Sequence, residues 1–290
     1  MPPMQPSGTA LDADWLGACR GAVAGLRDVL AAHPRTRQRA VETGDRGEGG
    51  DRTLVIDEGA EHAVFAQLDA LHAAGHRFTA VSEERGEVDY GGAGGSGVRV
   101  VIDPIDGSLN AKRLMPHYAL SIAVADGPTM ADVAFAYVFD FGAGEEWTAR
   151  RGEGAQLDGV PLDPALPERR AADGRLELLG IEQADPQWVA ASMDELQAIT
   201  RRLRVIGAIA VTLCQVAAAR LDGMASLRNC RAVDAAAAQL IVREAGGLIA
   251  FPRCTGGEPL SAPLDVAARS PVVAARSAET LARLARVPAV

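Results

Sequence analysis

The sequence predicts a mixed α/β or α+β protein, and three observations support this prediction. Segments whose apolar residues recur at helical spacing alternate with short apolar runs along the whole chain, which is typical of helices packed on sheets. The chain has 290 residues, of which 48% are hydrophobic, enough for a sizeable core. We find no internal repeat and no low-complexity linker, so we expect one large domain or two fused halves.

The first half is predicted to follow a disordered start, because residues 1–9 are rich in proline, serine and glycine. The polar, glycine-rich segments 43–52 and 85–97 are predicted to be loops. Periodicity and turn residues predict the remaining elements: helices over 11–30 and 55–74, strands over 78–84, 98–102, 118–125 and 131–139, and a hairpin over 146–159.

The best candidate boundary between two halves is the polar, proline-containing segment 161–174. It separates an N-terminal α+β half, residues 10–160, from a C-terminal α/β half, residues 175–290. The elements predicted in the second half are strands over 176–180, 203–206, 248–251 and 272–275, and helices over 187–200, 208–220, 234–245 and 277–286.

Composition narrows the class of protein. The net charge of -9 argues against a basic face for nucleic acid, and no apolar run approaches the roughly 20 residues that span a bilayer. The four cysteines form no C-x-x-C pair, so a zinc site is not expected. Without a recognisable signal peptide, these features predict a cytoplasmic protein with no nucleic-acid or membrane partner. Lys112 is the only lysine.

The stretch VVIDPIDGS, residues 100–108, is an apolar run that delivers two acids. Proline lacks an N–H and cannot extend a central ladder, so we expect the strand to stop at Asp103. A helical turn beginning at Pro104 would then bring Asp106 to the same side as Asp103.

Two converging carboxylates repel each other, and a hard cation such as Mg²⁺ is the usual remedy. The backbone N–H groups of Gly107 and Ser108 would suit a phosphate oxygen. From this stretch alone, a turn in which Asp103 and Asp106 only cap N–H groups is an equally good interpretation.

Other acids stand at the ends of predicted elements. Glu83 and Glu84 end a strand, whereas Asp57 and Asp234 open helices. Taken singly, these acids read as solvated charge or as helix caps. Taken together they favour a site, because binding residues collect at element ends.

Five blocks, in order along residues 15–285, resemble the inositol monophosphatase superfamily of lithium-sensitive, Mg²⁺-dependent phosphomonoesterases. They read TLVIDEGAE, SEE, DPIDGS, WTARRGEGA and VDAAAAQLIVREAGG. The GGDRT at 49–53 and the Arg-Asn pair at 228–229 resemble archaeal-type members that also act on fructose bisphosphate. The resemblance implies a layered α/β/α/β/α sandwich of the sugar-phosphatase type and a homodimer.

The resemblance also implies roles for individual residues. Two or three Mg²⁺ ions would be held by Glu83, Asp103, Asp106, Asp234 and the carbonyl of Ile105. Catalysis would use a metal-activated water, with Glu83 at the metals and the Ser108 hydroxyl paired to Asp57. The N-terminal half would carry most ligands. The residues implied to bind phosphate or the rest of the substrate are Gly107, Ser108, Gly207, Ala208, Arg228, Asn229 and Arg231.

The predicted function is Mg²⁺-dependent hydrolysis of a phosphate monoester of a small polyol or sugar, with inositol 1-phosphate as the leading substrate. Ser82, Val233 and the segment after Asn110 depart from the family pattern and leave the substrate open. The alternatives are fructose-1,6-bisphosphatase, 3′-phosphoadenosine-5′-phosphate phosphatase, histidinol-phosphatase or a sugar phosphatase of secondary metabolism, or a non-catalytic binding relative.

Three further features remain open or are set aside. Lys112 and Arg113 would either meet a second anionic group or form a solvated basic turn. His117 reads as a structural residue more than as a catalyst. The G-x-G-x-x-G run at 92–97 is not a dinucleotide fingerprint, because a strand follows it where a helix is needed; it reads as a flexible loop.

Overall fold

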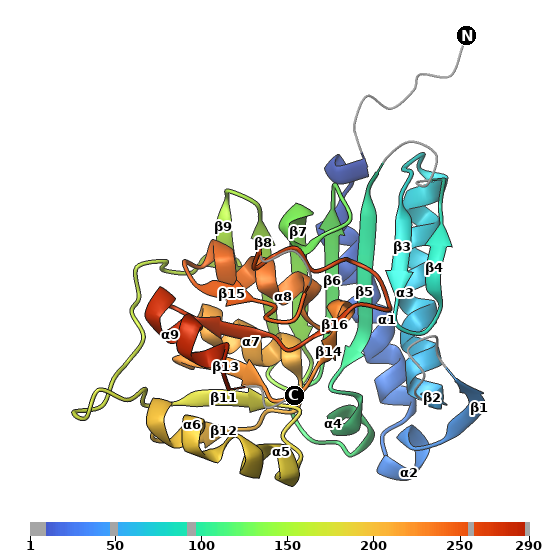
Figure 1. Cartoon of the computed structure of the whole chain (residues 1–290). Coiled ribbons are helices and arrows are strands. Elements are labelled where there is room, and N and C mark those ends of the chain that lie inside the picture. Colours follow the sequence, from blue (N-terminus) through green and yellow to red (C-terminus); the bar gives the residue numbers. More distant parts are fainter. Residues whose placement is uncertain (1–9, 47–51, 92–96, 255–257, 288–290) are drawn as a thin grey trace.

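The computed structural model describes residues 10–46, 52–91, 97–254 and 258–287 (Figure 1). The segment 1–9, for which the sequence predicts disorder, lies outside these ranges. So do residues 92–96, which form most of the glycine-rich run.

Five layers build the molecule, in the order helix, sheet, helix, sheet, helix (Figure 1). Helices α1 (Trp15–Ala32) and α3 (Val55–Ala73) cover one face of a large sheet, and helices α7 (Ile209–Ala217) and α8 (Ala232–Glu244) cover the other. A smaller sheet follows, and the helices on its outer face are α5 (Pro186–Ala191), α6 (Met193–Ile199) and α9 (Ala278–Leu284). This architecture confirms the predicted α/β/α/β/α sandwich.

The large sheet has the strand order β10-β9-β8-β7-β6-β5-β3-β4. Only β3 and β5 pair in parallel, and every other neighbouring pair is antiparallel. Its strands are β3 (Thr79–Ser82), β4 (Gly86–Asp89), β5 (Arg99–Asp106), β6 (Ala119–Ala125), β7 (Val133–Asp140), β8 (Glu145–Arg150), β9 (Gly154–Leu157) and β10 (Val160–Pro161).

The small sheet has the order β12-β11-β13-β17-β15, formed by β11 (Leu179–Glu182), β12 (Leu203–Arg204), β13 (Gly223–Ser226), β15 (Leu248–Ala250) and β17 (Val273–Ala275). Two further pairs stand apart, β1 (Glu42–Arg46) with β2 (Arg52–Leu54) and β14 (Cys230–Arg231) with β16 (Arg269–Ser270). The short remaining helices are α2 (Thr36–Arg39), α4 (Ser108–Lys112) and the 3₁₀ turns Ala10–Asp12 and Met130–Asp132.

The middle helices α7 and α8 are built largely from small buried residues. The alanines 235–238 of α8 are fully buried, and they share one core cluster with residues of both sheets. Alanine allows close approach of a helix to a sheet, and close packing without voids is what stabilises such a core. The starts of these two helices are thereby held against the ends of the sheet strands. Within the described residues, every helix is too short or too polar to span a bilayer.

Several predicted loops contain strands. Residues 42–46 and 52–54 pair as β1 and β2, and residues 86–89 form β4 at the edge of the large sheet. Over residues 43–46, 52 and 86–89 the prediction of a loop was therefore wrong, because backbone pairing with a neighbouring strand overrides a polar, glycine-rich composition. Residues 47–51 and 92–96 of the same segments lie outside the described ranges. The predicted helix over 187–200 is two helices, α5 and α6, with Ser192 between them.

The prediction that the opening strand stops at Asp103 was also wrong. Strand β5 continues through Pro104 to Asp106. Its pairing with β6 shifts between Asp103, opposite Ser121, and Asp106, opposite Ala119, so one extra residue is accommodated as a bulge. A bulge tolerates proline, and β3 has already ended opposite Ile102, so no partner needs the missing N–H on that side.

Candidate active site

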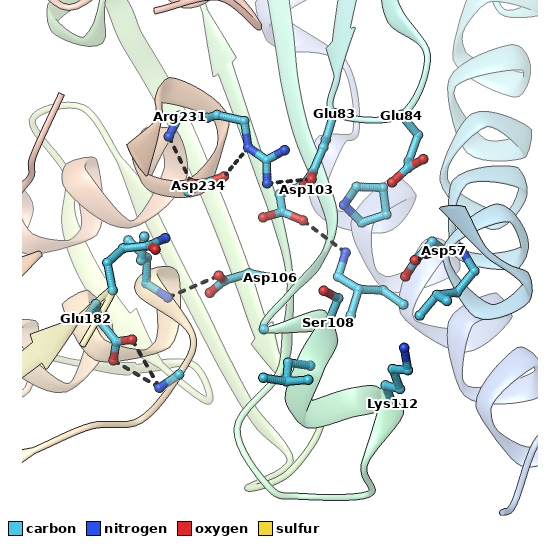
Figure 2. Close-up of a pocket in the computed structure, with 18 of the residues that line it drawn as sticks. Asp57, Glu83, Glu84, Asp103, Asp106, Ser108, Lys112, Glu182, Arg231 and Asp234 are labelled. Atoms are coloured by element: carbon cyan, nitrogen blue, oxygen red, sulfur yellow. Dashed lines mark hydrogen bonds and ion pairs between the residues drawn. The ribbon is translucent and has the colours of Figure 1, made fainter. Parts of the chain in front are cut away.

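A pocket of about 620 Å³ opens where the ends of β3 and β5 meet the starts of α3, α4, α7 and α8 (Figure 2). Its lining is strongly acidic. The acids that line it are Glu42, Asp57, Glu83, Glu84, Asp103, Asp106, Glu182 and Asp234. The five acids to which the sequence analysis gave roles, Asp57, Glu83, Asp103, Asp106 and Asp234, are therefore brought to one cavity.

The bulge in β5 turns both of its aspartates toward the pocket. In an unbroken strand, residues three apart face opposite sides, and the extra residue at the bulge cancels this alternation. Asp103 Oδ1 accepts a hydrogen bond from Ile105 N at 3.1 Å. Asp106 accepts from the first N–H groups of α7, at 3.1 Å from Ile209 N and 2.7 Å from Ala210 N. The convergence predicted for these acids thus arises from a bulge.

Asp57 and Asp234 each occupy the third position of a helix. Asp57 Oδ2 accepts from Leu54 N at 3.1 Å, and Asp234 Oδ2 accepts from Arg231 N at 3.0 Å. Each carboxylate therefore caps its helix and lines the pocket as well. The cap interpretation is therefore confirmed, and a functional role for Asp57 and Asp234 stays a prediction that their position in the pocket permits.

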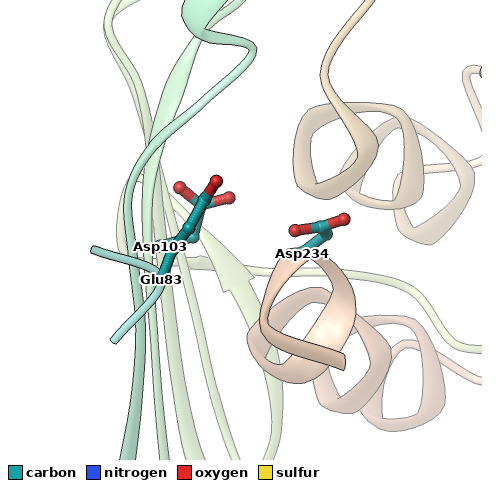
Figure 3. A group of neighbouring side chains, drawn as sticks. All are labelled: Glu83, Asp103 and Asp234. Carbon is teal, nitrogen blue, oxygen red and sulfur yellow. The ribbon is translucent and has the colours of Figure 1, made fainter. Parts of the chain in front are cut away.

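Glu83, Asp103 and Asp234 form the tightest carboxylate group (Figure 3). One oxygen from each lies within 4.8 Å of the others. Ligands of an octahedral Mg²⁺ lie about 2.1 Å from the ion, which places ligand oxygens about 3 to 4.2 Å from one another. Asp234 Oδ1 is buried and accepts no hydrogen bond within normal geometry, and its counter-charge is Arg231 Nε at 3.4 Å. An oxygen-liganded divalent cation would therefore fit this donor set after small side-chain adjustments.

Electrostatics at these acids also favour a cation. Burial raises the pKa of Asp103 well above its usual value, and the charges of Glu83, Asp106 and Asp234 raise it further. Burial likewise raises the pKa of Asp106, with Asp234 as the second cause. A bound cation would offset both the desolvation and the mutual repulsion, because it favours the ionised form of each carboxylate.

Gly107 links β5 to α4 in a conformation that excludes side chains. Its φ is 81°, and a Cβ there would lie 2.9 Å from Ala208 Cβ and 3.0 Å from the carbonyl oxygen of Gly207. This close approach brings the link between β5 and α4 against the start of α7. Ser108 begins α4 beside Gly107 and faces the same cavity as Asp57 (Figure 2). The hydrogen bond inferred between Ser108 and Asp57 remains a prediction.

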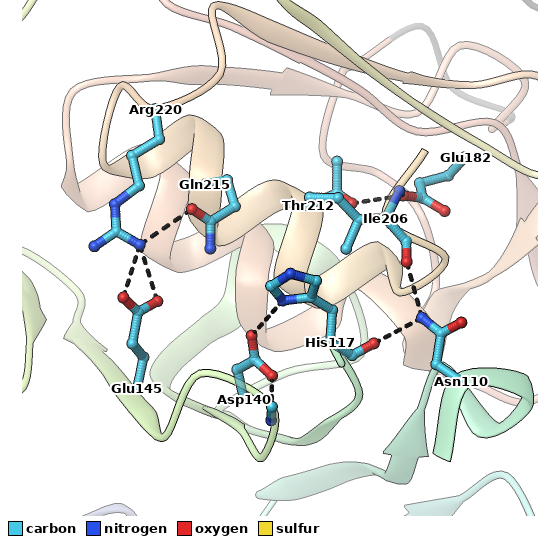
Figure 4. A network of polar contacts seen from close by, with 10 residues as sticks. Asn110, His117, Asp140, Glu145, Glu182, Ile206, Thr212, Gln215 and Arg220 are labelled. Carbon is cyan, nitrogen blue, oxygen red and sulfur yellow. Dashed lines mark hydrogen bonds and ion pairs between the residues drawn. The ribbon is translucent and has the colours of Figure 1, made fainter. Parts of the chain in front are cut away.

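Asn110 holds two loops in place beneath the pocket (Figure 4). Its Nδ2 donates to the carbonyl oxygens of His117, at 2.9 Å, and Ile206, at 2.8 Å. Glu182 belongs to the same region, and it accepts from Gly207 N at 3.1 Å and from Thr212 Oγ1 at 2.6 Å. The sequence analysis missed Glu182, although it ends an apolar run just as Glu83 does.

The predicted substrate contacts of the second half are only partly at the pocket. Gly207 lines it, whereas Ala208, Arg228 and Asn229 are not among the described lining residues. Arg228 is exposed, and its guanidinium lies over the ring of Trp188 at 5.6 Å from the centroid. A role for Arg228 or Asn229 in binding a substrate therefore stays a prediction that would need a larger ligand.

The sequence left the roles of Lys112, Arg113 and His117 open, and only the first of these lines the pocket. Lys112 lines the pocket, and Figure 2 shows its side chain directed toward Asp57, whereas Arg113 is exposed and outside the lining. His117 Nδ1 contacts the buried Asp140 at 2.9 Å, and His117 does not line the pocket. The contact with Asp140 supports the structural interpretation of His117.

Ser82, which stands where the family commonly has glycine, binds a buried acid behind the pocket. Ser82 Oγ donates to Glu61 at 2.8 and 2.9 Å, and Arg85 lies 3.6 Å from the same carboxylate. Burial, only partly offset by Ser82 and Arg85, raises the pKa of Glu61 to about 7. Glu61 therefore binds a proton more tightly in the folded than in the unfolded chain.

Glu61→Gln should remove a pH dependence of stability. Because the folded pKa of Glu61 is raised, its contribution is fully present below about 4.5 and is lost as pH rises through about 7. At pH 8 the variant should therefore be more stable than the wild type, by up to about 3 kcal/mol, with little difference at pH 5. Thermal unfolding at pH 5 to 8 in chelator would test this. A constant difference across that range would contradict it.

Comparisons with known proteins agree with this geometry. The sequence matches the model of the inositol monophosphatase family over residues 15–287. It is 34% identical to a fructose-1,6-bisphosphatase/inositol-1-monophosphatase of Methanothermobacter thermautotrophicus, over 80% of this chain and 82% of the relative. It is 32% identical to the Nus factor SuhB of Escherichia coli, over 81% and 83%. A crystal structure of an inositol monophosphatase-fructose 1,6 bisphosphatase matches with a TM-score of 0.78 and 24% identity, over 95% of this chain and 100% of that one.

Proposed function

Because the chain belongs to the inositol monophosphatase family, we propose that it hydrolyses a phosphate monoester of a small polyol or sugar, with inositol 1-phosphate as the preferred substrate. The convergence of Glu83, Asp103 and Asp234, with oxygens within 4.8 Å of one another, is the observation that carries the proposal. A protein that only bound a ligand would have no physical need to keep three mutually repelling carboxylates together, two of them buried. The non-catalytic alternative is thereby disfavoured.

Mg²⁺ would be held by Glu83, Asp103, Asp106, Asp234 and the carbonyl of Ile105, in two or three positions. When bound, it would polarise the phosphate and lower the pKa of water. The chain itself would orient the substrate. Gly107 and Ser108 line the cavity beside the acids, and their N–H groups would hold phosphate oxygens. The Ser108 hydroxyl and Asp57 would share a proton and orient the attacking water.

The lining favours a polyol over a nucleotide. None of the described residues around the cavity is aromatic, so a nucleobase would find no ring on which to stack. Carboxylates and the Gln183 amide provide acceptors for hydroxyl groups. For a bisphosphate, the basic residues in the described lining are Lys112 and Arg231, and Arg231 already contacts acids. These features support the proposal of inositol 1-phosphate over adenosine and fructose bisphosphates.

Phosphate release from a substrate panel would test the proposal. With Mg²⁺ present, we expect the highest kcat/KM for inositol 1-phosphate, compared with fructose 1,6-bisphosphate, 3′-phosphoadenosine 5′-phosphate and histidinol phosphate. Chelation of Mg²⁺ should abolish release, because the carboxylates alone repel a phosphate. Hydrolysis that survives chelation would contradict the metal mechanism. Inertness of every substrate would favour the binding relative.

A homodimer, a cytoplasmic location and the absence of nucleic-acid partners remain predictions. All four cysteines are free thiols, as expected for a reducing compartment. Several relatives are named Nus factor SuhB, a name that concerns those proteins. Light scattering coupled to size exclusion would test the dimer.

A further inference from the structure

The guanidinium of Arg231 lies between two of the three converging carboxylates (Figure 2). Its Nη2 is 2.5 Å from Glu83 Oε1, and its Nε is 3.4 Å from Asp234 Oδ1. Arg231 ends β14 and immediately precedes α8, so its backbone is fixed by the start of the helix that carries Asp234. The sequence analysis had grouped Arg231 with substrate contacts, whereas the structure directs it at the predicted metal ligands.

Arg231 contacts the same carboxylates that a bound ion would need. Glu83, Asp103 and Asp234 offer the oxygens that lie within 4.8 Å of one another, and Arg231 engages two of these three carboxylates. The pair is well shielded from water, with side-chain exposures of 16% for Arg231 and 15% for Glu83. Solvent and salt weaken an ion pair away from water much less than a pair on the surface, so breaking it has a substantial cost in free energy.

We propose that Arg231 is a built-in counter-cation of the metal site, which Mg²⁺ must displace from Glu83 and Asp234 in order to bind. This inference rests on the metal site of the proposed function and adds a residue that limits its affinity. A guanidinium and a divalent ion cannot share the same carboxylate lone pairs at contact distance, so their occupancy is competitive. The intrinsic affinity of the carboxylates for Mg²⁺ is thereby reduced by the cost of releasing Arg231.

The hold of Arg231 on the start of α8 does not depend on its guanidinium. Its backbone N–H donates to Asp234 Oδ2 at 3.0 Å, independently of the side chain. The guanidinium can therefore leave while the cap that holds Asp234 stays in place.

The chain offers a matched control in Arg269. Arg269 is the antiparallel partner of Arg231 in the β14–β16 pair, and it is exposed and outside the described lining of the pocket. Its charge also lowers the pKa of Asp234. Arg269→Gln therefore removes one nearby positive charge without removing the contact with Glu83. Comparison of the two variants therefore separates the effect of a nearby positive charge from direct competition for the carboxylates.

Calorimetric titration of the chelator-treated full chain with Mg²⁺ would test the inference. Arg231→Gln should bind Mg²⁺ at least about tenfold more tightly than the wild type, because a charge within about 4 Å of both ligands is removed. Arg269→Gln should tighten binding by less than about threefold, since exposed charges are screened. Arg231→Lys keeps the charge but cannot bridge both carboxylates. Its affinity for Mg²⁺ should therefore lie between those of Arg231→Gln and Arg269→Gln.

Thermal unfolding gives a second readout that does not depend on activity. In chelator, Arg231→Gln should have a lower Tm than the wild type, because its acids have lost their counter-charge. Addition of Mg²⁺ should raise the Tm of Arg231→Gln by more than it raises that of the wild type. If the wild type binds no Mg²⁺, the proposed function itself fails. If the wild type binds Mg²⁺ but Arg231→Gln binds it no more tightly than Arg269→Gln does, only the displacement model is overturned. Should the glutamine variant not fold, Arg231→Lys must still bind Mg²⁺ more tightly than the wild type.

Discussion

Asp103→Asn should lower kcat for phosphate release by on the order of a thousandfold, because metal-derived charge stabilisation is worth several kcal/mol and each 1.4 kcal/mol is tenfold. Asp103 lies at the centre of the carboxylate group, and only 3% of its surface is exposed. An amide would keep the shape of the side chain but lose the charge that attracts the ion. Mg²⁺ binding, measured by calorimetry, should weaken in parallel with activity.

The same variant should remain folded. The charges of Glu83, Asp106 and Asp234 all oppose ionisation of Asp103, so removing one charge relieves repulsion. We therefore expect the Tm in chelator to match or exceed that of the wild type. Asp234→Asn should lose activity in the same way. Asp194→Asn, an exposed position on the outer face of the small sheet, is the matched control and should leave activity unchanged. Full activity in Asp103→Asn would refute the proposed metal site.

Gly107→Val should abolish activity and destabilise the fold by about 3 kcal/mol, since backbone strain and overpacking each cost about 1 to 3 kcal/mol. The residue adopts a φ of 81°, and a Cβ would lie 2.9 Å from Ala208 Cβ and 3.1 Å from the carbonyl oxygen of His117. To relieve these contacts, the β5–α4 link must move away from the start of α7. That movement would displace Asp106, whose carboxylate is held by Ile209 and Ala210 of α7.

Gly174→Val separates the two causes. Gly174 has a φ of 80°, and nothing lies within 4 Å of the Cβ that would be added. The control therefore carries the backbone strain without the clash. It should lose about 1 to 2 kcal/mol of stability and keep its activity. Urea unfolding and phosphate release would measure both quantities, and an active Gly107→Val would show that the close approach at Gly107 is dispensable.

The acids at helix starts show what local sequence can predict. Asp57 and Asp234 each stand two residues after the first residue of a helix, where a carboxylate reaches back to a free backbone N–H. That preference is a property of a few consecutive residues, so it is visible in the chain itself. The strand that ends directly before Glu83, and the apolar start of the strand that carries Asp103, follow from apolar runs in the same way.

Strand β13 and the bulge at Pro104 show where local patterns fail. Residues 223–226 read GMAS and carry no clear strand signal, yet they pair with β11 and β17 inside the small sheet. Proline at 104 argued for the end of a strand, yet β6 continues to pair beyond it. In both cases pairing with a distant segment outweighs the intrinsic preference of the residues.

By itself the sequence determined the class of fold and the order of most elements, because both depend on periodicity within a few residues. It also nominated five acids, from their positions at element ends and from the family resemblance, and all five line the pocket. The tertiary structure alone decided that Arg231 faces Glu83, that Glu182 joins the pocket wall, and that Arg228 turns to Trp188. These outcomes depend on which segments far apart in the chain bury one another. The partners of side chains in such contacts depend on packing and charge in three dimensions, and a pattern of a few consecutive residues does not predict them.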